Sequence, residues 1–359
     1  MKKNTLFSEK EILVGPDSGQ DNYIMAIESS CDETACAIVK NGREVISNIV
    51  ASQIKTHEKF GGVIPEIAAR EHLDSINIVV QEAFDQSGLK PNDITAFAGT
   101  VGPGLVGCLL VGLNAAKTLA LVYDKPFIGV NHLNAHLCAN YIETDIKPPY
   151  MALLISGGHT QIIDVESYSK QTILGETIDD AVGEAYDKVA RLIGLPYLGG
   201  PRLDKLAQLG NPKAYEFPQA KVDGYNFSFS GLKTAVLRLV KNLKKEYCTE
   251  ENQELPENVI NDICASFQEC VSRTLVKKLK KAVEERGYNQ VVIAGGVAAN
   301  SEIRKKVFDL EKEGYHVHAP AMKYCTDNAS MVVVFLRPVW LERIEVLLGK
   351  VGNISAFEG

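Results

Sequence analysis

The chain has 359 residues, of which 38 are basic and 45 acidic, and its formal net charge is −7. At roughly 150 residues per domain, this length predicts about two domains, each able to bury a core. A composition of 45% hydrophobic and 23% charged residues excludes a disordered, collagen-like or coiled-coil chain. The acidic balance argues against binding nucleic acid through overall charge. The charge is uneven, however: residues 1–232 have a net charge of −9 and residues 233–359 of +2.

The first half of the chain has the pattern of three strands followed by alternating helices and strands. Residues 1–20 are predicted to be a polar extension. Short apolar runs with turn residues between them indicate strands, and apolar residues at helical spacing indicate helices. The predicted strands are Tyr23–Glu28, Thr34–Val39, Glu44–Ser47, Ala96–Thr100 and Phe127–Val130, and the predicted helices are Ile64–Ser87, Leu105–Tyr123 and one that begins near His132.

The second half repeats this order of elements without a visible sequence repeat. Its strands are predicted at Tyr150–Ile155, Thr160–Val165, Gln290–Ala294 and His316–Ala319, and its helices at Asp180–Ile193, Gly231–Lys245, Asp262–Arg286 and Asn300–Gly314. A boundary near Lys147–Pro149 is expected, because prolines punctuate the chain there. The prediction is therefore an N-terminal lobe over residues 21–148 and a C-terminal lobe over residues 149–359.

The sequence predicts a cytoplasmic protein that does not enter a membrane. No apolar run of signal-peptide length precedes the polar residues Ser8, Glu9, Lys10 and Glu11, and no stretch of 18 apolar residues occurs. None of the eight cysteines belongs to a Cys-x-x-Cys pair, and most lie in apolar segments. They are expected to be reduced, buried thiols.

Two histidines are candidates for a metal site. If residues 132–136 are helical, His132 and His136 lie one turn apart on the same face, as two ligands of one divalent cation do. Leu133 stands where a His-Glu-x-x-His protease has its general base, which argues against proteolysis. Asp327, in a polar cluster after a predicted strand, is the candidate third ligand. The alternative is a pair of structural histidines and an ordinary Asx turn or helix cap.

Glycine-rich turns follow three of the predicted strands. Gly102–Gly104, Gly157–Gly158 and Gly295–Gly296 would let phosphate oxygens approach backbone N–H groups, although each is also a normal tight connection. The segment Ile293–Asn300 is more specific, since a strand end, two glycines and small residues make a flat floor for an adenine.

Carboxylates gather on the predicted helix that follows Asp179. One interpretation gives these carboxylates a purely structural role, as an N-terminal cap and as partners in ion pairs such as Glu184–Lys188. The functional interpretation has Asp187 contacting hydroxyl or amine groups of a substrate. Gly200 and Asp204 then offer a close backbone approach and another carboxylate.

Taken together, eight ordered motifs closely resemble the universal tRNA threonylcarbamoyladenosine transferase family, called TsaD in bacteria and formerly annotated O-sialoglycoprotein endopeptidase. The resemblance covers about residues 23–331, and the sequence after Met331 departs from the family pattern. The motifs are IESSCDET (residues 27–34), NHLNAH (131–136), SGGHTQ (156–161), GEAYDK (183–188), GGP (199–201), FSGLKT (229–234), AGGVAAN (294–300) and CTDNA (325–329).

The resemblance implies a fold and a reaction. The fold is α/β, with two duplicated RNase-H-like lobes of the actin/Hsp70/sugar-kinase type and a central nucleotide cleft. The reaction transfers the threonylcarbamoyl group of threonylcarbamoyl-adenylate to N6 of adenosine 37, next to the tRNA anticodon, and releases AMP. The alternative is a phosphotransferase of the same fold, of the sugar- or acetate-kinase type, which would share the phosphate turns but has no need of a histidine pair beside Asp327.

The resemblance also implies roles for individual residues. His132, His136 and Asp327 would hold one divalent metal, iron or zinc. Asp32 and Glu33 fall where related kinases and ATPases place acidic residues near phosphate and metal, so they are the expected catalytic residues, with magnesium a further candidate accompanying the nucleotide. The expected adenylate-binding residues are Leu154, Ile155, Ser156, Gly157, Gly158, Asp187, Gly200, Asp204 and Asn300.

Several partners are expected. The family acts on tRNA and works in bacteria with a small paralogous pseudo-enzyme subunit (TsaB-like) and a P-loop ATPase subunit (TsaE-like), while an adenylate-forming enzyme supplies the substrate. The predicted helix Leu105–Tyr123 is either a packing surface for the paralogue or an internal core helix.

The predicted helix Asp262–Arg286 has a basic face, made of the residues at 273, 277, 278, 280 and 281, and more basic residues follow at 304–306. This basic face is either a surface for tRNA or an ordinary solvated helix face. An acidic chain with so modest a basic surface is expected to bind tRNA weakly by itself.

Overall fold

The computed structural model describes residues 21–142, 144–168, 170–248 and 254–334. The predicted extension over residues 1–20 and the atypical tail after residue 334 lie outside this part of the chain. The described residues form two compact units: residues 21–53, 63–144 and 327–334 make the first, and residues 54–62 and 145–326 make the second. The predicted lobes are continuous in sequence, whereas this grouping places residues 327–334 with the first unit and 54–62 with the second.

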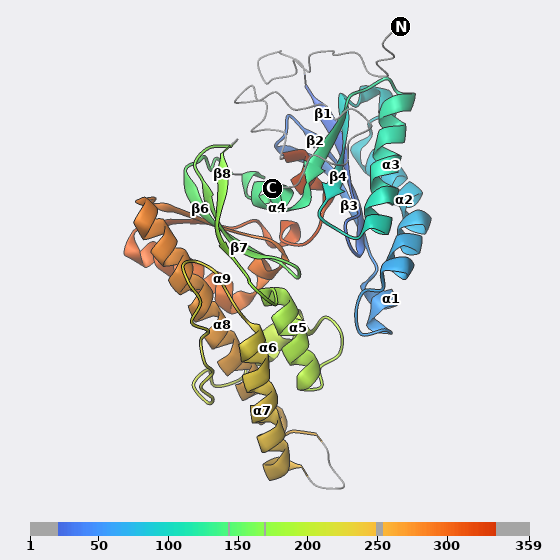
Figure 1. The fold of residues 1–359 in the computed structure, drawn as a ribbon. Coiled ribbons are helices and arrows are strands. Elements are labelled where there is room, and N and C mark those ends of the chain that lie inside the picture. Colours follow the sequence, from blue (N-terminus) through green and yellow to red (C-terminus); the bar gives the residue numbers. More distant parts are fainter. Residues whose placement is uncertain (1–20, 143, 169, 249–253, 335–359) are drawn as a thin grey trace, which may run out of the picture. The chain divides into compact units, whose positions relative to one another are not determined.

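The first unit is a five-stranded sheet with helices on both faces (Figure 1). The strand order is β3-β2-β1-β4-β5, in which β1, β2 and β3 are antiparallel and β4 and β5 run parallel to β1. Helices α2 and α3 cover one face, and α4 and α10 lie against the other. The bounds are β1 Tyr23–Glu28, β2 Glu33–Lys40, β3 Glu44–Ser52, α2 Pro65–Ser87, β4 Ala96–Gly102, α3 Val106–Val122, β5 Phe127–Asn131, α4 His132–Cys138 and α10 Ala329–Val334.

The second unit repeats the same sheet. Its order is β8-β7-β6-β9-β10, again with an antiparallel meander and two strands parallel to the central one. The predicted duplication of the fold is therefore confirmed. The bounds are α1 Ile54–Glu58, β6 Tyr150–Ile155, β7 Thr160–Val165, β8 Gln171–Glu176, α5 Val182–Leu192, α6 Gly199–Ala207, α7 Ser230–Tyr247, α8 Glu257–Arg286, β9 Gln290–Ala294, α9 Ser301–Phe308 and β10 His316–His318.

Most of the predicted elements are present, with differences that have local causes. Strand β8 was not predicted, because it is a half-exposed edge strand without clean alternation. Helix α6 was not predicted, because it begins with two glycines and a proline, residues typical of a turn. The helix predicted over Asn300–Gly314 ends at Phe308 and continues as a short 3₁₀ segment. Within the described residues, no helix has both the length and the apolar character needed to cross a membrane.

Each unit buries its own core around its central strand. Strands β1 and β6 are buried along almost their whole length, since strands flank them on both sides and helices cover their faces. In the first unit, Gly112 of α3 lets the helix approach the loop after β1. Ser29 there donates from Oγ to the Cys108 carbonyl at 2.8 Å and accepts from the Gly112 N–H at 3.1 Å.

This close approach predicts that Gly112→Ala destabilises the first unit. A Cβ at Gly112 would lie 2.4 Å from Ser29 Oγ and 2.9 Å from Ile27 Cγ2, both fully buried. We expect a loss of roughly 1–3 kcal/mol, measured as a lower thermal midpoint by circular dichroism. Gly231→Ala is the control, because a Cβ there meets nothing within 4 Å. Equal midpoints for the two variants would contradict the close packing.

Candidate metal centre and active site

Helix α4 presents two histidines from its first two turns. Asn131 is its N-cap, and the Asn131 side chain accepts hydrogen bonds from the backbone N–H groups of Leu133 at 2.9 Å and Asn134 at 3.2 Å. This cap starts the helix at His132 and places His136 one turn later. The sequence NHLNAH therefore fixes the relative position of the two rings locally, and their centroids lie 4.6 Å apart.

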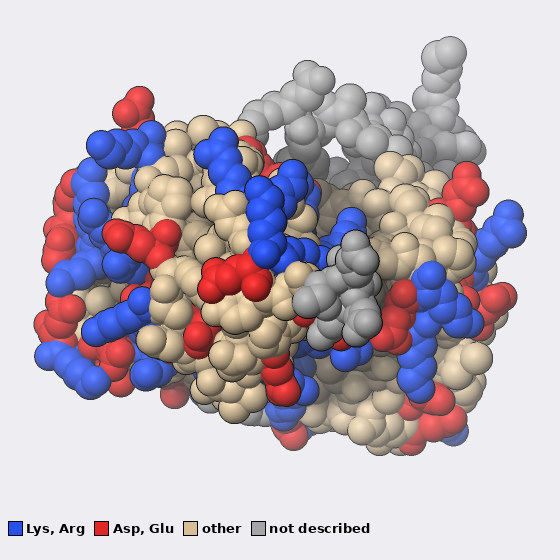
Figure 2. All heavy atoms as spheres, turned by 90° about the horizontal axis from the view of Figure 1, so that it is seen from below, with Lys and Arg blue, Asp and Glu red and all other residues tan. Residues whose placement is uncertain are grey.

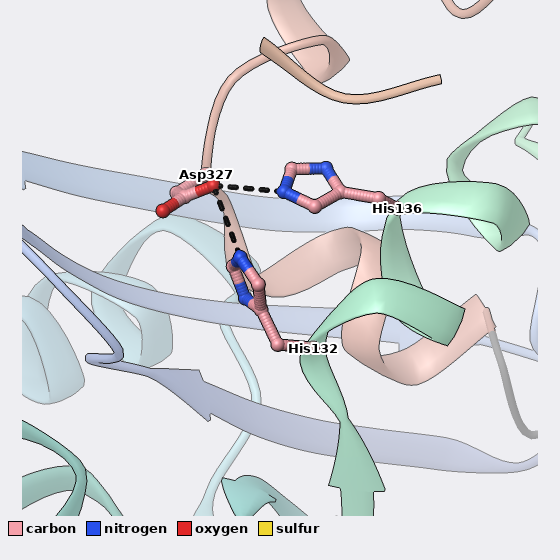
Figure 3. A group of neighbouring side chains, drawn as sticks. All are labelled: His132, His136 and Asp327. Carbon is pink, nitrogen blue, oxygen red and sulfur yellow. Dashed lines mark ion pairs between the residues drawn. The ribbon is translucent and has the colours of Figure 1, made fainter. Parts of the chain in front are cut away.

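Asp327 meets both rings (Figure 3). Its Oδ1 lies 3.0 Å from Nε2 of His136 and 3.7 Å from Nε2 of His132. Two ligands of a tetrahedral zinc ion are separated by about 3.4 Å, given metal–ligand bonds of about 2.1 Å. One ligand atom from each of His132, His136 and Asp327 lies within 4.8 Å of the other two, so the three side chains could share one ion. Among the described residues, they form the group of His, Cys, Asp or Glu side chains that meets this condition. The three predicted ligands thus fit a divalent metal site.

Opposite charges dominate the electrostatics of this cluster. Burial disfavours the imidazolium form of His132, but the carboxylates of Asp327 and Glu28 outweigh it and raise the pKa of His132 to about 9. Burial also favours the neutral form of Asp327, but His132 and His136 lower the pKa of that carboxyl to about 2. A cation bound here would take the place of a proton, so its binding must release protons.

The predicted catalytic carboxylates lie in the same unit. Burial, the neighbouring Asp32 carboxylate and Asp327 raise the pKa of Glu33 to about 9. Glu33 therefore keeps its proton near pH 7 and hydrogen-bonds within a carboxyl pair with Asp32. The buried side chain of His72 contacts both ends of the segment that carries Asp32 and Glu33. Its Nε2 lies 3.0 Å from the Cys31 carbonyl oxygen, and its Nδ1 lies 2.7 Å from Thr34 Oγ1.

The predicted adenylate-binding residues lie in the second unit. The turn after β6, which includes Ser156, approaches the start of α5, and the Gly183 N–H donates to the Ser156 carbonyl at 3.2 Å. Added Cβ atoms at Gly157, Gly158 or Gly296 would meet nothing within 4 Å. The backbone of these turns is therefore open on the side where a ligand could approach it.

Contacts between helices join the other four predicted residues of this set. One turn along α5, the Asp187 Oδ1 accepts from the Gly200 N–H at 3.0 Å. Burial raises the pKa of Asp187, and the Gly200 N–H partly opposes this. One turn along α6, Asp204 accepts from the Ser301 N–H and hydroxyl at the start of α9, next to Asn300.

A glutamine that the sequence analysis did not identify completes this network. Gln268 of α8 donates from Nε2 to Asp204 at 2.9 Å and accepts from Asn300 Nδ2 at 2.9 Å. Asp204 and Asn300 are therefore held by protein partners. The only sequence signal was a polar residue on the buried face of a long amphipathic helix.

Several charged residues on α5 and α8 of the second unit have partners within the unit. Lys188 binds Asp180 at 2.6 Å and Glu184 at 2.8 Å, so the predicted Glu184–Lys188 pair is confirmed. On α8, Lys281 pairs with Glu285, and Lys278 donates to backbone carbonyls of residues 222, 224 and 226. On the face drawn in Figure 2, Lys and Arg side chains lie among Asp and Glu side chains. These contacts favour a solvated face on α8, of which Lys280 and Lys281 are in ion pairs.

Solved structures with a similar fold have little sequence identity to this chain. Full-length HypF in its phosphate- and nucleotide-bound form has a TM-score of 0.60 and 14% identity over 92% of this chain and 47% of its own. HypF of T. kodakarensis has a TM-score of 0.62 and 14% identity over 90% of this chain and 48% of its own. With the two matching sheets, these likenesses confirm the predicted α/β fold of the actin/Hsp70 type.

Curated relatives are far closer in sequence. A protein of Clostridioides difficile (strain 630) named tRNA N6-adenosine threonylcarbamoyltransferase is 52% identical over 316 residues, 87% of this chain and 91% of its own. A protein of the same name from Christiangramia forsetii is 51% identical over 88% of this chain and 92% of its own. The family model TsaD, described as tRNA N6-adenosine threonylcarbamoyltransferase, matches residues 44–334. The chain belongs to this family of tRNA-modifying transferases.

Proposed function

We propose that the chain takes the threonylcarbamoyl group from threonylcarbamoyl-adenylate, transfers it to N6 of adenosine 37 in tRNA and releases AMP. The transfer to tRNA adenosine follows from family membership, which does not favour the phosphotransferase alternative. The observation that carries the finer proposal is the meeting of His132, His136 and Asp327 in a unit that also holds the Asp32–Glu33 pair.

The chemistry needs no protein nucleophile. The donor is a mixed carbamic–phosphoric anhydride, so its carbonyl carbon is already activated. The N6 nitrogen forms a bond to this carbon, the bond from the carbon to the phosphate oxygen breaks, and AMP leaves with the electron pair. An iron or zinc ion held by His132, His136 and Asp327 would stabilise the charge that develops on the leaving phosphate. The protein must hold the weakly nucleophilic amine in line and accept its proton.

We assign the general base to Asp32 and the proton-holding role to Glu33. A base must be ionised before it can accept a proton, and Glu33, with a pKa of about 9, keeps its own proton near pH 7. The protonated Glu33 can instead donate a hydrogen bond to Asp32 and fix its orientation. His72 supports this arrangement by binding the backbone at Cys31 and the side chain of Thr34.

We place the adenylate on the second unit. The turn Ser156–Gly158, which follows Leu154 and Ile155 at the buried end of β6 and is open at Gly157 and Gly158, would receive the phosphate through backbone N–H groups. Asp187 would contact a hydroxyl or amine of the nucleotide, beside the Gly200 backbone. Asp204 and Asn300, both bonded to Gln268, would shape the rest of the site.

We place the small paralogous, TsaB-like subunit on the exposed face of α3. Val106, Leu110 and Leu121 lie on one face of this helix and are 73%, 48% and 59% exposed. A partner of related fold can bring an equivalent helix against this stripe. The P-loop ATPase (TsaE-like) and the adenylate-forming enzyme complete the proposed set, which we expect to work in the cytoplasm.

The direct test of the function measures modified adenosine. The chain, with the full partner set, is mixed with threonylcarbamoyl-adenylate and a tRNA transcript, and nucleosides are analysed by mass spectrometry. We expect His136→Ala and Asp327→Ala to abolish transfer, and Asp32→Asn to slow single turnover by roughly 10²–10⁴-fold. Glu33→Gln, which mimics the protonated side chain, should retain more activity than Asp32→Asn. A transcript with guanosine at position 37 is the negative control, and the absence of modified adenosine with all partners present would overturn the proposal.

The protonated Glu33 also predicts a pH dependence of stability. In the unfolded chain its carboxyl has the ordinary pKa of 4.5, and in the metal-free folded chain about 9. Between these values the folded state binds more protons, so this group makes stability fall as pH rises. Glu33→Gln cannot ionise, so in this variant the pH-dependent loss of stability that Glu33 causes is absent. We expect the thermal midpoint of Glu33→Gln, relative to the parent chain treated with chelator, to rise between pH 6 and pH 9 by about 2 °C or more. A constant difference across this range would show that Glu33 ionises normally.

Partner-dependent tRNA binding tests the α3 surface. The isolated chain, with its net charge of −7, should bind tRNA weakly and lose that binding as salt increases. Adding the paralogous and ATPase subunits should raise the affinity at least about tenfold, and Leu110→Glu should prevent this gain. Leu209→Glu is the matched control, because Leu209 is 70% exposed in the second unit. Tight, salt-resistant binding by the isolated chain would contradict this account.

A further inference from the structure

We propose that Glu28 is a positioning residue of the metal centre: its buried carboxylate holds the Nδ1 edge of His132, so that Nε2 of the same ring is presented to the ion. This inference rests on the proposed metal site and assigns a role to a residue that the sequence analysis did not single out. Glu28 is the last residue of β1 and is 0% exposed. Its Oε2 lies 3.2 Å from Nδ1 of His132.

The geometry makes Glu28 a support for the ligand rather than a ligand itself. Nε2 of His132 faces Asp327, whereas Glu28 contacts the opposite nitrogen of the ring. When Nδ1 donates its proton to this carboxylate, Nε2 is left with the lone pair that a metal requires. A carboxylate on the far nitrogen also makes the imidazole a more basic ligand.

Other groups fix the Glu28 carboxylate in turn. The Ser30 N–H donates to Oε1 at 2.6 Å, and the Thr100 hydroxyl donates to Oε2. Ser30 Oγ also lies 3.2 Å from Nδ1 of His132. Glu28 is the last residue of β1 and Thr100 lies near the end of β4, and these adjacent parallel strands are paired through Ile27 and Gly99. The support for the metal ligand is therefore built on two sheet strands and on Ser30 of the loop that follows β1.

The two histidines differ in this respect. Nδ1 of His136 is buried and has no hydrogen-bond partner among the described residues. His132 is therefore positioned by a carboxylate at Nδ1, whereas the hydrogen-bonding contact of the His136 ring among the described residues is the one to Asp327. Removing the Glu28 charge should consequently weaken metal binding without removing any ligand.

The test measures metal binding to the purified full chain, independently of activity. Zn²⁺ affinity is determined by competition with a chromophoric chelator, and the Co²⁺ absorption spectrum reports the coordination geometry. Glu28→Gln should weaken Zn²⁺ binding about 10–100-fold and alter the Co²⁺ spectrum. Thr100→Val, which removes only the hydroxyl that holds Glu28, should weaken it several-fold, and Thr100→Ser should restore it.

Controls separate this inference from the metal site itself. Asp164→Asn removes another buried carboxylate, 1% exposed in the second unit, and should leave Zn²⁺ affinity unchanged. If the parent chain binds one Zn²⁺ that His132→Ala abolishes, while Glu28→Gln and Thr100→Val both bind as tightly as the parent, the role of Glu28 is refuted and the metal site stands. If the parent chain binds no ion, the proposed metal site fails first. Should Glu28→Gln not fold, the Thr100 pair decides the question alone.

Discussion

The contact between Asp327 and the two imidazoles of α4 closes the first unit. The chain leaves this unit after Thr144, builds the second sheet, and returns at Asp327. The segment that follows Asp327 is anchored at once, because every residue of α10 is buried against β1, β2 and α4. The Asn328 side chain accepts from the Met331 N–H at 3.2 Å and so starts this short helix. The Asp327 carboxylate can contact His132 and His136 only because the segments before and after the second unit both pack on the sheet of the first unit.

The topology explains why the chemistry gathers at one edge. Parallel strands of an open sheet end at the same edge, and ligands of such folds bind beyond those ends. In the first unit, Glu28, Thr100 and Asn131 lie at or next to the ends of β1, β4 and β5, and α4 with its histidines starts there. In the second unit, the turns after β6 and β9 occupy the equivalent places. The duplicated fold therefore offers the same edge twice, once with side chains that fit a divalent metal site and once with open glycine turns.

The sequence predicted those features that depend on neighbouring residues. The spacing of His132 and His136 is a local property of a capped helix, and the duplicated order of strands follows from hydrophobic pattern. The Glu28 contact was not predictable, because its partners arrive from β4 and α4 through strand register and not through spacing. Gln268 was hidden for the same reason: its two partners come from α6 and from the start of α9. Asp327 was found because a polar cluster stood out after a strand, yet only the fold brings it to α4.

Electrostatics link metal binding to the proton on Glu33. After burial and Asp32, the Asp327 carboxylate is the next contribution that raises the pKa of Glu33. A cation bound to Asp327 would offset that one contribution and lower the pKa of Glu33 only in part, because burial and Asp32, the two larger causes, would remain. By reciprocity, ionisation of Glu33 strengthens cation binding by the same factor. Burial and Asp32 therefore favour the protonated form of Glu33 in both states, which is what its role beside Asp32 requires. The retained proton keeps Glu33 from adding a further negative charge beside Asp32 and Asp327, while the coupling makes the pKa of Glu33 depend on the cation.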